Sequence, residues 1–395
     1  MRILLINDYR EAGGCERIMQ RTAAGLRRRG HEIEVFTGED VPGRRMPWSY
    51  IENRRARRAL RARLDSYAPD IVHFFNVYHE LSPGVIEEAD RWRAGRQARV
   101  LMTCADAHLV CPNAALQRFD GGCARVFDSG SLTTGWQLWR TRWDERSRAH
   151  SLLKSLQHTW NYRVQRRWRC IDVAICASKF LESALVPCGV PTVRIPDPLP
   201  ERVPTHAASC GDGPVRLVFC GRVEPEKGLC EFIEAAAGIE GWTLDVVGDG
   251  RDRVRAEQVV QQRGVSDRVR FIGKVEAEEA VGHIAQADIL VLPSRCCENA
   301  PACMFEALAC GTGLLVGNLG GMPEIVADSG VGLVFDPFDA ADMREMLVRT
   351  IEDHRGGRVA GGDVSGYLAS RSVEKYLDRL EMLYDGGLGG MRCAC

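Results

Sequence analysis

Long hydrophobic runs of the kind that cross a membrane are missing from this 395-residue sequence. No apolar stretch reaches the roughly 18 residues that indicate a transmembrane helix. The N-terminus, MRILLIN, also lacks the apolar centre and the small-residue cleavage site of a secretory signal. We therefore expect a cytoplasmic protein, and in that compartment the 16 cysteines stay reduced rather than forming disulfides.

A recognisable metal-binding spacing is missing too. Cys104, Cys111 and Cys123 are the trio of cysteines that suggests a metal, and they lack the paired Cys-x-x-Cys knuckles of structural zinc sites. We therefore predict no metal, and we predict no cofactor.

The composition is that of a globular protein, with 45% hydrophobic and 27% charged residues. Its length suits two domains of roughly 150 to 200 residues each. The charge divides in a similar way, since residues 1–195 carry 32 Lys and Arg against 21 Asp and Glu. The remaining residues carry 20 against 32, so a basic half precedes an acidic half. This asymmetry favours two domains.

The first half reads as alternating strands and helices. Ile3–Ile6 is a short buried strand, and Ile18–Arg29 has the apolar spacing of a helix that ends at Gly30. His31–Thr37 alternates as the next strand, and further strands are expected at Asp70–Phe75, Arg99–Thr103 and Asp172–Ala177. This order implies right-handed crossovers and a parallel sheet.

The second half repeats this pattern from Val215 onward. Strands are predicted at Arg216–Cys220, Thr243–Val247, Arg268–Ile272, Ile289–Leu292 and Gly313–Val316. Helices are predicted at Leu229–Ala237, Arg251–Arg263, Ala277–Ala287, Ala302–Ala309 and Ala340–Glu352. The fold class is therefore α/β, with two doubly wound Rossmann-like domains that hold ligands outside the carboxyl ends of their strands.

Domain boundaries follow from composition. Residues 1–195 form the first domain, 196–213 are a linker rich in Pro, Gly and Ser, and 214–355 form the second domain. Residues 356–395 are a C-terminal segment, and its helical pattern, Val373–Tyr384, could pack back onto the first domain.

The most informative segment runs from residue 294 to residue 308. A strand ends before it, its loop carries Glu298, and Pro301 stands where a helix would begin. Glu306 lies just over one turn further along, where it could bond a hydroxyl of a ligand. The alternative is a capping carboxylate and a solvated helix face. Amides in a first helical turn suit a phosphate, so we also place in this site Asn299, Ala300, Ala302 and Cys303.

Here the sequence resembles the GT-B glycosyltransferases of the family 4 type, which keep the anomeric configuration of the sugar they transfer. The hallmark of that family is two glutamates separated by seven residues, which Glu298 and Glu306 match. The resemblance covers nearly the whole chain, from Ile3 to about Glu352. It implies that Glu298 contacts the donor sugar and that Glu306 contacts the ribose of the nucleotide.

A second match to the family is the segment 219–228, which reads FCGRVEPEKG. Arg222 at the end of a strand and Lys227 at the start of the next helix would converge on one small volume. Two cations there can neutralise a diphosphate as the glycosidic bond breaks and negative charge builds on the leaving group. The alternative is a turn with a solvated arginine and lysine.

Loops at other strand ends match the family less specifically. Gly13 and Gly14 follow the first strand, where glycine lets the backbone approach a phosphate at a helix N-terminus; a plain turn is an equal alternative. Gly248 ends another predicted strand, and it too could serve only a turn. The resemblance implies that main chain near Lys274 and Val275 holds the nucleobase.

One loop of the first domain departs from the family. Many relatives carry His-Asp and then Cys-Pro after the fourth strand, with the histidine near the reacting sugar. This sequence has Ala105 in place of that histidine, while Asp106, Cys111 and Pro112 match. His108 could replace the histidine only if the loop is reshaped, and is otherwise an ordinary loop or core residue. Asp106 is either a polar group near the acceptor or a turn residue.

Two segments of the first half concentrate positive charge. Residues 44–63 contain eight arginines and one glutamate, and residues 140–169 contain nine Arg or Lys, two acids, Trp143, Trp160 and Trp168. Arginine with tryptophan suits an anionic membrane surface, or an acidic or diphosphate-bearing acceptor. Nucleic acid fits neither the fold nor the acidic second half. We therefore hypothesise peripheral attachment to the inner face of the membrane; the alternative is a solvated helical face with core tryptophans.

The leading hypothesis is a retaining glycosyltransferase that moves a sugar from a nucleotide diphosphate sugar to a hydroxyl acceptor in glycan or glycolipid biosynthesis. Its expected catalytic residues are Glu298, Arg222, Lys227 and Asp106, and the acceptor, which could be lipid-linked, would lie near Asp106 and His108. Ala105 motivates an alternative, a non-catalytic nucleotide-sugar-binding subunit that supports a partner enzyme. A third hypothesis is a nucleotide-sugar epimerase of similar fold.

The sequence contains no Asp-x-Asp motif, which would hold a divalent cation on the diphosphate in the other large glycosyltransferase fold. Cationic side chains and backbone amides would neutralise the diphosphate instead. We therefore expect the rate of sugar transfer to be unchanged after treatment with EDTA. Rates measured with EDTA, and again after magnesium is added back, test this; a full loss of activity that magnesium restores would contradict it.

Overall fold

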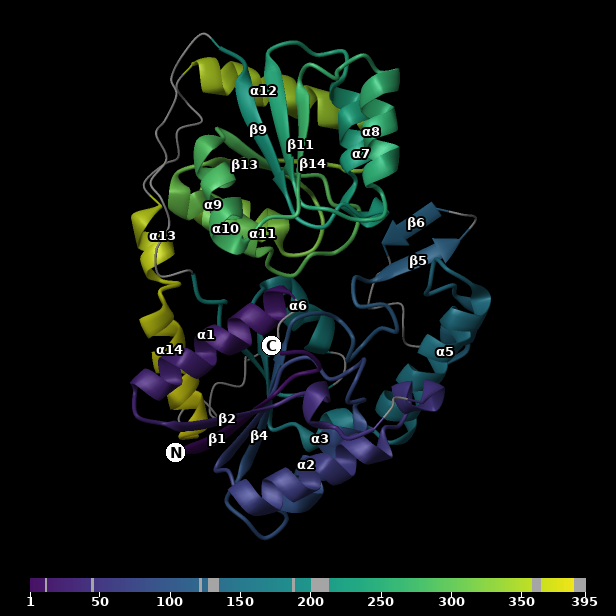
Figure 1. The fold of residues 1–395 in the computed structure, drawn as a ribbon, viewed down its shortest axis with the longest axis vertical. Coiled ribbons are helices and arrows are strands. Elements are labelled where there is room, and N and C mark those ends of the chain that lie inside the picture. The colour runs from purple at the N-terminus through teal and green to yellow at the C-terminus, as the bar shows by residue number, and fades with distance from the viewer. Residues whose placement is uncertain are drawn as a thin grey trace. The chain divides into compact units, whose positions relative to one another are not determined.

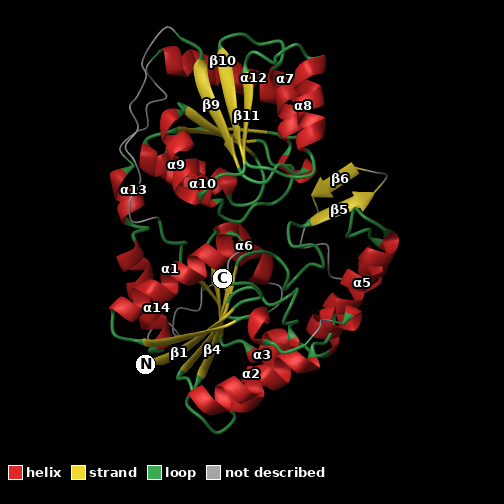
Figure 2. Ribbon diagram, viewed as in Figure 1, coloured by secondary structure: helices red, strands yellow, loops and turns green. Residues whose placement is uncertain are grey.

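The computed structural model describes residues 1–10, 13–43, 46–120, 123–126, 135–186, 189–199, 213–356 and 364–386. The chain divides into two compact units, the first made of Met1–Pro198 and Val373–Cys395 and the second of Leu199–Ser372. Each unit contains a six-stranded parallel sheet with helices on both faces (Figure 1, Figure 2). The predicted α/β class with two doubly wound domains is confirmed.

The sheet of the first unit has the strand order β2-β1-β3-β4-β7-β8, and all neighbouring strands are parallel. The order reverses between β1 and β3, so the connections that leave these two strands run in opposite directions and leave room for a ligand. The strands are β1 (Arg2–Ile6), β2 (Glu32–Phe36), β3 (Ile71–Phe74), β4 (Arg99–Cys104), β7 (Val173–Cys176) and β8 (Thr192–Arg194).

The helices of the first unit cover both faces of this sheet (Figure 2). They are α1 (Gly14–Arg28), η1 (Gly38–Asp40), η2 (Pro47–Tyr50), α2 (Arg54–Tyr67), α3 (Gly84–Arg93), α4 (Gly135–Arg140), α5 (Arg148–His158), η4 (Thr159–Val164), η5 (Arg167–Cys170), α6 (Lys179–Leu185) and α14 (Val373–Tyr384). A separate antiparallel hairpin consists of β5 (Gln117–Asp120) and β6 (Cys123–Val126).

The sheet of the second unit has the strand order β11-β10-β9-β12-β13-β14, and it reverses between β9 and β12. Its strands are β9 (Val215–Cys220), β10 (Trp242–Val247), β11 (Val269–Gly273), β12 (Ile289–Leu292), β13 (Gly313–Gly317) and β14 (Leu333–Phe335). Its helices are η7 (Pro225–Lys227), α7 (Leu229–Ala236), α8 (Arg253–Gln262), α9 (Ala277–Gln286), α10 (Ala302–Cys310), α11 (Met322–Ser329), α12 (Ala340–Arg355) and α13 (Ser365–Ala369).

Consecutive residues of the central strands enter opposite cores, which is why β12 is apolar throughout and β9 is apolar except at Arg216. In β9, Leu217 and Phe219 pack with α7 and α12, while Val218 between them packs with α9 and α10. In β12, Ile289 and Val291 belong to the first of these cores, with Leu290 in the second. Helices are therefore needed on both faces of the sheet.

The division into units differs from the predicted boundaries. The first unit continues to Pro198 rather than 195, and most of the expected linker, residues 200–212, lies outside the described residues. The expected C-terminal segment, 356–395, is divided between the units. Its helix α13 packs on the second unit, where the guanidinium of Arg371 covers the rings of Phe305 and Tyr367, and α14 belongs to the first.

Helix α14 packs along α1, as Figure 1 shows. The contact is close because Gly25 has no side chain; a Cβ there would lie 2.5 Å from Leu377. Arg29, just after α1, binds three carboxylates of α14, those of Glu374, Asp378 and Glu381. The first unit is therefore completed by a helix distant in sequence.

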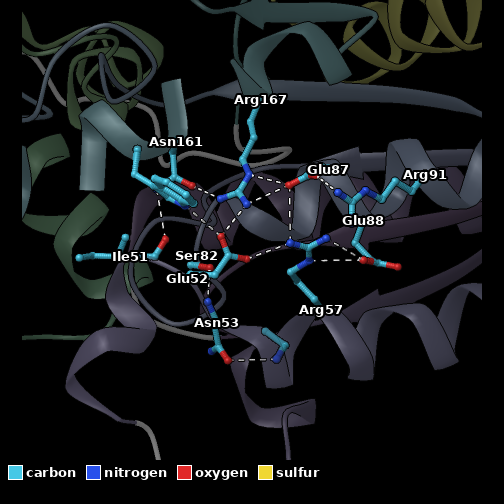
Figure 3. A network of polar contacts seen from close by, with 12 residues as sticks. Ile51, Glu52, Asn53, Arg57, Ser82, Glu87, Glu88, Arg91, Asn161 and Arg167 are labelled. Carbon is cyan, nitrogen blue, oxygen red and sulfur yellow. Dashed lines mark hydrogen bonds and ion pairs between the residues drawn. The ribbon is translucent and has the colours of Figure 1, made fainter. Parts of the chain in front are cut away.

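Several arginines of the two basic segments form ion pairs within the first unit. Arg57 binds Glu52 and Glu88, and Arg63 binds Glu34. Arg167 is almost fully buried, where it donates to Glu52 and to Glu87 (Figure 3).

The tryptophans of the second basic segment also differ from the expectation of a membrane-facing set. Trp143 is fully buried and donates to the carbonyl of Leu138 at 2.8 Å, and Trp168 is partly buried. Only Trp160 of these three is exposed. The amphipathic pattern alone could not separate core tryptophans from surface ones.

Replacing Arg29 with methionine should lower the free energy of unfolding of the first unit by about 1 to 2 kcal/mol, because three carboxylates lose a shared cation. Urea denaturation followed by tryptophan fluorescence measures this, since seven of the eight tryptophans lie in the first unit. Arg379→Met, on the exposed face of the same helix, is the matched control and should unfold like the wild type. An Arg29→Met protein as stable as that control would contradict the anchoring role.

Candidate functional site

The switch point of the second sheet brings two of the predicted motifs together. Residues 221–228 follow β9, residues 293–300 follow β12, and these two strands are parallel neighbours. Because the carboxyl ends of parallel strands meet at one edge of a sheet, both loops leave from the same place.

The two loops touch at Gly228, which has φ +69°. A Cβ at this position would lie 2.1 Å from the carbonyl oxygen of Pro293, so no other residue fits without moving one of the loops. In the same contact, the N–H of Arg295 donates to the carbonyl of Glu226 at 2.8 Å. This close approach places Lys227 beside the loop that carries Glu298.

Lys227 and Glu298 form an ion pair at this contact. The hydroxyl of Ser294 donates to the same carboxylate at 3.0 Å. Burial lowers the pKa of Lys227, but attraction to Glu298 outweighs this and raises the pKa above its ordinary value, so the lysine stays protonated. The site therefore holds a fixed positive charge whose partner is the predicted sugar-binding glutamate.

The backbone of Glu298 is held by a glycine turn from the opposite side. Gly320 has φ +64°, and a Cβ there would lie 2.1 Å from the carbonyl oxygen of Glu298. The next residue, Gly321, donates its N–H to that carbonyl at 2.7 Å. These glycines therefore support the position of Glu298.

Arg222 lies at the same edge and is largely free of protein contacts. Its side chain is 71% exposed, and its nearest carboxylate is that of Glu226, at 3.9 Å. Arg222 is nevertheless close enough to Lys227 to oppose the rise of the lysine pKa. Two cations therefore share this region, one paired with a carboxylate and one open to solvent.

Helix α10 begins beside this pair. Pro301 is the N-cap rather than the expected first helical residue, since its ψ of 120° is not helical, and α10 starts at Ala302. The first amides of a helix have no partner within it and point outward, which suits an anion. Cys303 lies in this first turn and is partly buried, as are the loop residues Asn299 and Ala300.

Glu306 lies in the second turn of α10 and is only 5% exposed. It follows Met304 and Phe305, which are core residues, and it makes polar contacts within the protein. A carboxylate in this position is held in place rather than solvated, which contradicts the alternative of a solvated helix face. Its predicted contact with a ribose stays a prediction.

The other strand ends of this sheet carry the remaining predicted residues. Gly248 follows β10 and donates its N–H to the carbonyl of Gly273 at 2.8 Å. Lys274 and Val275 come directly after β11 and are exposed and partly buried, respectively. All three lie at the carboxyl edge that also holds Lys227, and their roles stay predictions.

The first unit has an organised carboxyl edge of its own, and its main residue was missed by the sequence reasoning. Asp8, just after β1, accepts N–H donors from His79, Glu80 and Leu81 at 2.6, 2.9 and 2.8 Å. Burial raises its pKa to about 6, although the three amides oppose the rise. Asp8 therefore holds the loop after β3 against the end of β1. The available signal was a polar Asn7-Asp8 pair directly after a buried strand.

The predicted glycine loop lies beside Asp8. Helix α1 starts at Gly14, and Gly13 is in an extended conformation that any residue adopts. A Cβ at Gly14 would meet nothing within 4 Å. Neither backbone conformation therefore requires glycine, and the predicted phosphate contact stays a prediction.

The loop after β4 brings Asp106 and His108 together. The N–H of His108 donates to the Asp106 carboxylate at 2.9 Å, and the imidazole Nδ1 lies 2.9 Å from the same oxygen. His108 also stacks on Tyr78, with ring centroids 4.2 Å apart. Burial raises the pKa of Asp106, but its contacts with His108 outweigh this and lower it below the ordinary range. The histidine that follows Ala105 is therefore fixed against the aspartate that matches the family.

The cysteines of the predicted trio do not meet a third ligand in the described part of the chain. Cys104 and Cys111 are buried thiols, and the side chain of Cys123 lies outside the described residues. Among the residues described, no group of three or more His, Cys, Asp or Glu side chains is arranged to hold a metal ion. None of the described helices has the length and hydropathy needed to span a bilayer.

The Lys227–Glu298 pair should couple the two residues energetically. In a double-mutant cycle of Lys227→Met and Glu298→Gln, we expect a coupling energy of about 1 to 3 kcal/mol in the free energy of unfolding, because each single change leaves a partly buried polar group alone. The pair of exposed Arg349 and partly buried Asp353, 3.8 Å apart in the same unit, is the control and should couple by less than about 0.5 kcal/mol. Additive effects at 227 and 298 would show that the pair does not form.

Comparison with known proteins relates the second unit, which contains the Lys227–Glu298 pair, to glycosyltransferases. Residues 210–357 match the family model described as glycosyl transferases group 1. The chain is 30% identical over 146 residues to an alpha-D-kanosaminyltransferase of Streptomyces kanamyceticus, covering 36% of this chain and 37% of the relative. It is 31% identical over 204 residues to a GDP-mannose-dependent alpha-(1-6)-phosphatidylinositol monomannoside mannosyltransferase of Mycolicibacterium smegmatis, covering 48% and 53%. The matched segments thus span about a third to a half of these relatives.

Solved structures resemble the whole chain in fold. The sucrose-phosphate synthase of Thermosynechococcus elongatus superposes with a TM-score of 0.72 at 19% identity, covering 98% of this chain and 99% of that one. The resemblance to GT-B glycosyltransferases that the paired glutamates suggested is confirmed at the level of family and fold. Residues 210–357 form a glycosyl transferases group 1 domain, and the chain as a whole has the GT-B fold.

Proposed function

We propose that this protein is a retaining glycosyltransferase that moves a sugar from a nucleoside diphosphate sugar to a hydroxyl acceptor. The observation that carries the proposal is the ion pair of Lys227 with Glu298 at the switch point of the second sheet. A cation fixed beside a carboxylate offers one group to a diphosphate and the other to a sugar hydroxyl. The amides that begin α10 face the same region and add further donors for phosphate oxygens.

The donor would change the partners of this pair. A diphosphate carries more negative charge than a carboxylate, so it would attract the ammonium of Lys227 and the exposed guanidinium of Arg222. Glu298 would then be free to accept hydrogen bonds from the hydroxyls of the donor sugar. As the bond from the anomeric carbon to the diphosphate breaks, Lys227 and Arg222 would stabilise the charge that develops on the leaving oxygen.

Retention of configuration would follow from a front-face displacement. The acceptor hydroxyl forms a bond to the anomeric carbon on the side from which the diphosphate leaves, and a phosphate oxygen takes the hydroxyl proton. Such a step needs no protein nucleophile and no metal. Cationic side chains and amides supply the charge compensation in this proposal.

The donor would bind to the second unit and the acceptor to the first. Donor contacts would come from Glu306 on the ribose and from main chain near Lys274 and Val275 on the base. The mannosyltransferase relative is named as GDP-mannose-dependent, which supports a nucleoside diphosphate sugar as the donor class. In the first unit, Asp106 would face the acceptor hydroxyl, oriented by its contact with His108.

One observation favours a second candidate, a nucleotide-sugar-binding subunit without catalysis. Ala105 stands where related enzymes carry a histidine near the reacting sugar, and His108 is directed to Asp106 in this structure. A single-turnover experiment with a radiolabelled nucleotide sugar and an acceptor separates the two functions. Release of nucleoside diphosphate with transfer of the sugar supports the enzyme, and stable binding without release supports the subunit.

Replacing Glu306 with glutamine should weaken donor binding by about 1 to 3 kcal/mol, which is about 5- to 150-fold in Kd, because a charged hydrogen bond to the ribose becomes a neutral one. Thermal-shift titrations with UDP-, GDP- and ADP-sugars identify the donor for the wild type and then measure this loss. Glu345→Gln, on the exposed face of α12, is the matched control and should bind the donor like the wild type. An unchanged Kd for Glu306→Gln would remove Glu306 from the site.

A further inference from the structure

A cavity of about 680 Å³ opens on the first unit, at the carboxyl edge of its sheet. Its wall combines aromatic and aliphatic side chains with arginines. The side chains that give the cavity this mixed character are Met46, Trp48, Trp160, Arg54, Arg55 and Arg58. A cavity of this size accommodates a small ligand or a headgroup.

The cationic wall comes from the first two turns of α2. Asn53 caps this helix by accepting the N–H of Ala56 at 3.1 Å, and the first turn contains no acidic residue. Arg54 and Arg58 are exposed and pair with no carboxylate among the described residues. Arginines without counterions at the positive end of a helix repel one another and attract an anion.

The carboxylates near this wall are largely compensated. Glu52 lines the cavity, but Arg167 and Arg57 both bind it from the interior, as Figure 3 shows. Glu80 also lines the cavity and accepts from the hydroxyl of Tyr9 at 3.5 Å. With three arginines on the wall and Glu52 neutralised from behind, the cavity favours an anionic group.

An apolar stripe leads to the cavity along α5 and the π-helical turn η4. Every fourth residue is apolar and exposed, namely Leu152, Leu156, Trp160 and Val164, with exposures of 49%, 40%, 41% and 59%. Trp160 belongs both to the stripe and to the cavity wall, where its indole N–H donates to Glu52 at 3.4 Å. Trp48, on the cavity wall, is 64% exposed. A soluble anionic ligand alone would not explain this exposed apolar surface.

The cavity is connected to the proposed acceptor residues. The ring of Tyr50, next to the cavity wall, lies 6.4 Å from that of His79, and His79 lies 5.8 Å from His108. Glu80 of the cavity wall also donates its N–H to Asp8. The wall of the cavity is therefore packed, through Tyr50 and His79, against the loop of Asp106 and His108.

We propose that the acceptor is an anionic lipid whose charged group occupies this cavity while its apolar part lies along the stripe of α5 and η4. Arg54, Arg55 and Arg58 bind the phosphate, and Trp48 and Trp160 lie at the level of the headgroups. The inference rests on the proposed transferase function and names the class of its acceptor. The inference also restricts the membrane contact to the cavity and the stripe, whereas the sequence suggested the basic first half without a defined surface.

Sedimentation with vesicles of equal parts phosphatidylglycerol and phosphatidylcholine tests this assignment, using the full chain in low salt. The wild type should bind these vesicles and should not bind pure phosphatidylcholine. Arg54→Ser with Arg58→Ser should weaken binding about 25-fold, since each arginine near an anionic surface contributes about a factor of five. Leu152→Gln with Leu156→Gln should weaken it at least about tenfold at any salt concentration, because apolar burial is not screened.

The matched control is Arg28→Ser with Arg379→Ser, which removes two exposed arginines from α1 and α14 on the other face of the sheet. This variant should bind vesicles within about twofold of the wild type, although it has lost the same net charge. Equal losses for both arginine pairs would show that only net charge attracts the protein, and would overturn the cavity as the site. Melting temperatures of all variants confirm that each is folded.

Two further outcomes would overturn the lipid assignment. In the first, glycerol phosphate raises the melting temperature of the wild type but not that of Arg54→Ser with Arg58→Ser, and the wild type does not bind vesicles. That result would identify a soluble phosphorylated acceptor. If the protein does not bind anionic vesicles at all, the exposed apolar stripe must bind a partner other than a lipid.

Donor binding is measured in parallel by thermal shift without vesicles. If a nucleotide sugar binds and vesicles do not, only this inference fails; if no nucleotide sugar binds, the proposed function fails.

Discussion

The close approach of two loops at the ends of β9 and β12 is the constraint on which the second unit's site depends. These strands are neighbours although about seventy residues of chain separate them, because the sheet is wound outward in both directions from β9. Gly228 lets its loop pass within contact distance of Pro293, and Gly320 supports Glu298 from the other side. The ion pair of Lys227 and Glu298 is a consequence of this backbone packing. A carboxylate and an ammonium brought together with little solvent have each other as their best available partners.

In the first unit, a side chain rather than a glycine holds two strand-end segments together. Its sheet reverses direction between β1 and β3, and Asp8 at the end of β1 accepts three amides from the loop that follows β3. One carboxylate thereby provides partners for three backbone N–H groups in buried or partly buried surroundings. The loop that it holds carries Tyr78, on which His108 stacks. The geometry around Asp106 therefore depends on a residue almost a hundred positions earlier.

The arginines of the first unit fall into two sets, one that binds carboxylates inside the unit and one that lines the cavity. Arg57 and Arg167 face inward and bind the carboxylates of Glu52, Glu87 and Glu88, where they join α2, α3 and η5 into one polar core (Figure 3). Arg54 and Arg58, one turn apart at the start of α2, line the cavity. Arg57 is three residues from Arg54 and one from Arg58 on α2, so its inward pairing reflects the carboxylates of Glu52 and Glu88 within its reach. Net charge therefore says less about binding than the direction in which each arginine points.

The sequence by itself determined the alternation of strands and helices, since apolar runs in buried parallel strands and amphipathic helices have different periods. It located β12 and α14 to the residue and most of the other elements that it predicted within one to three residues. It also selected Lys227, Glu298 and Glu306, because their motifs are local in the chain. Only the tertiary structure decided that Lys227 meets Glu298, that His108 turns to Asp106, that Trp143 is core while Trp160 is exposed, and that Asp8 holds the loop after β3. Each of these depends on which distant segments become neighbours in a sheet, and periodicity carries no information about that order.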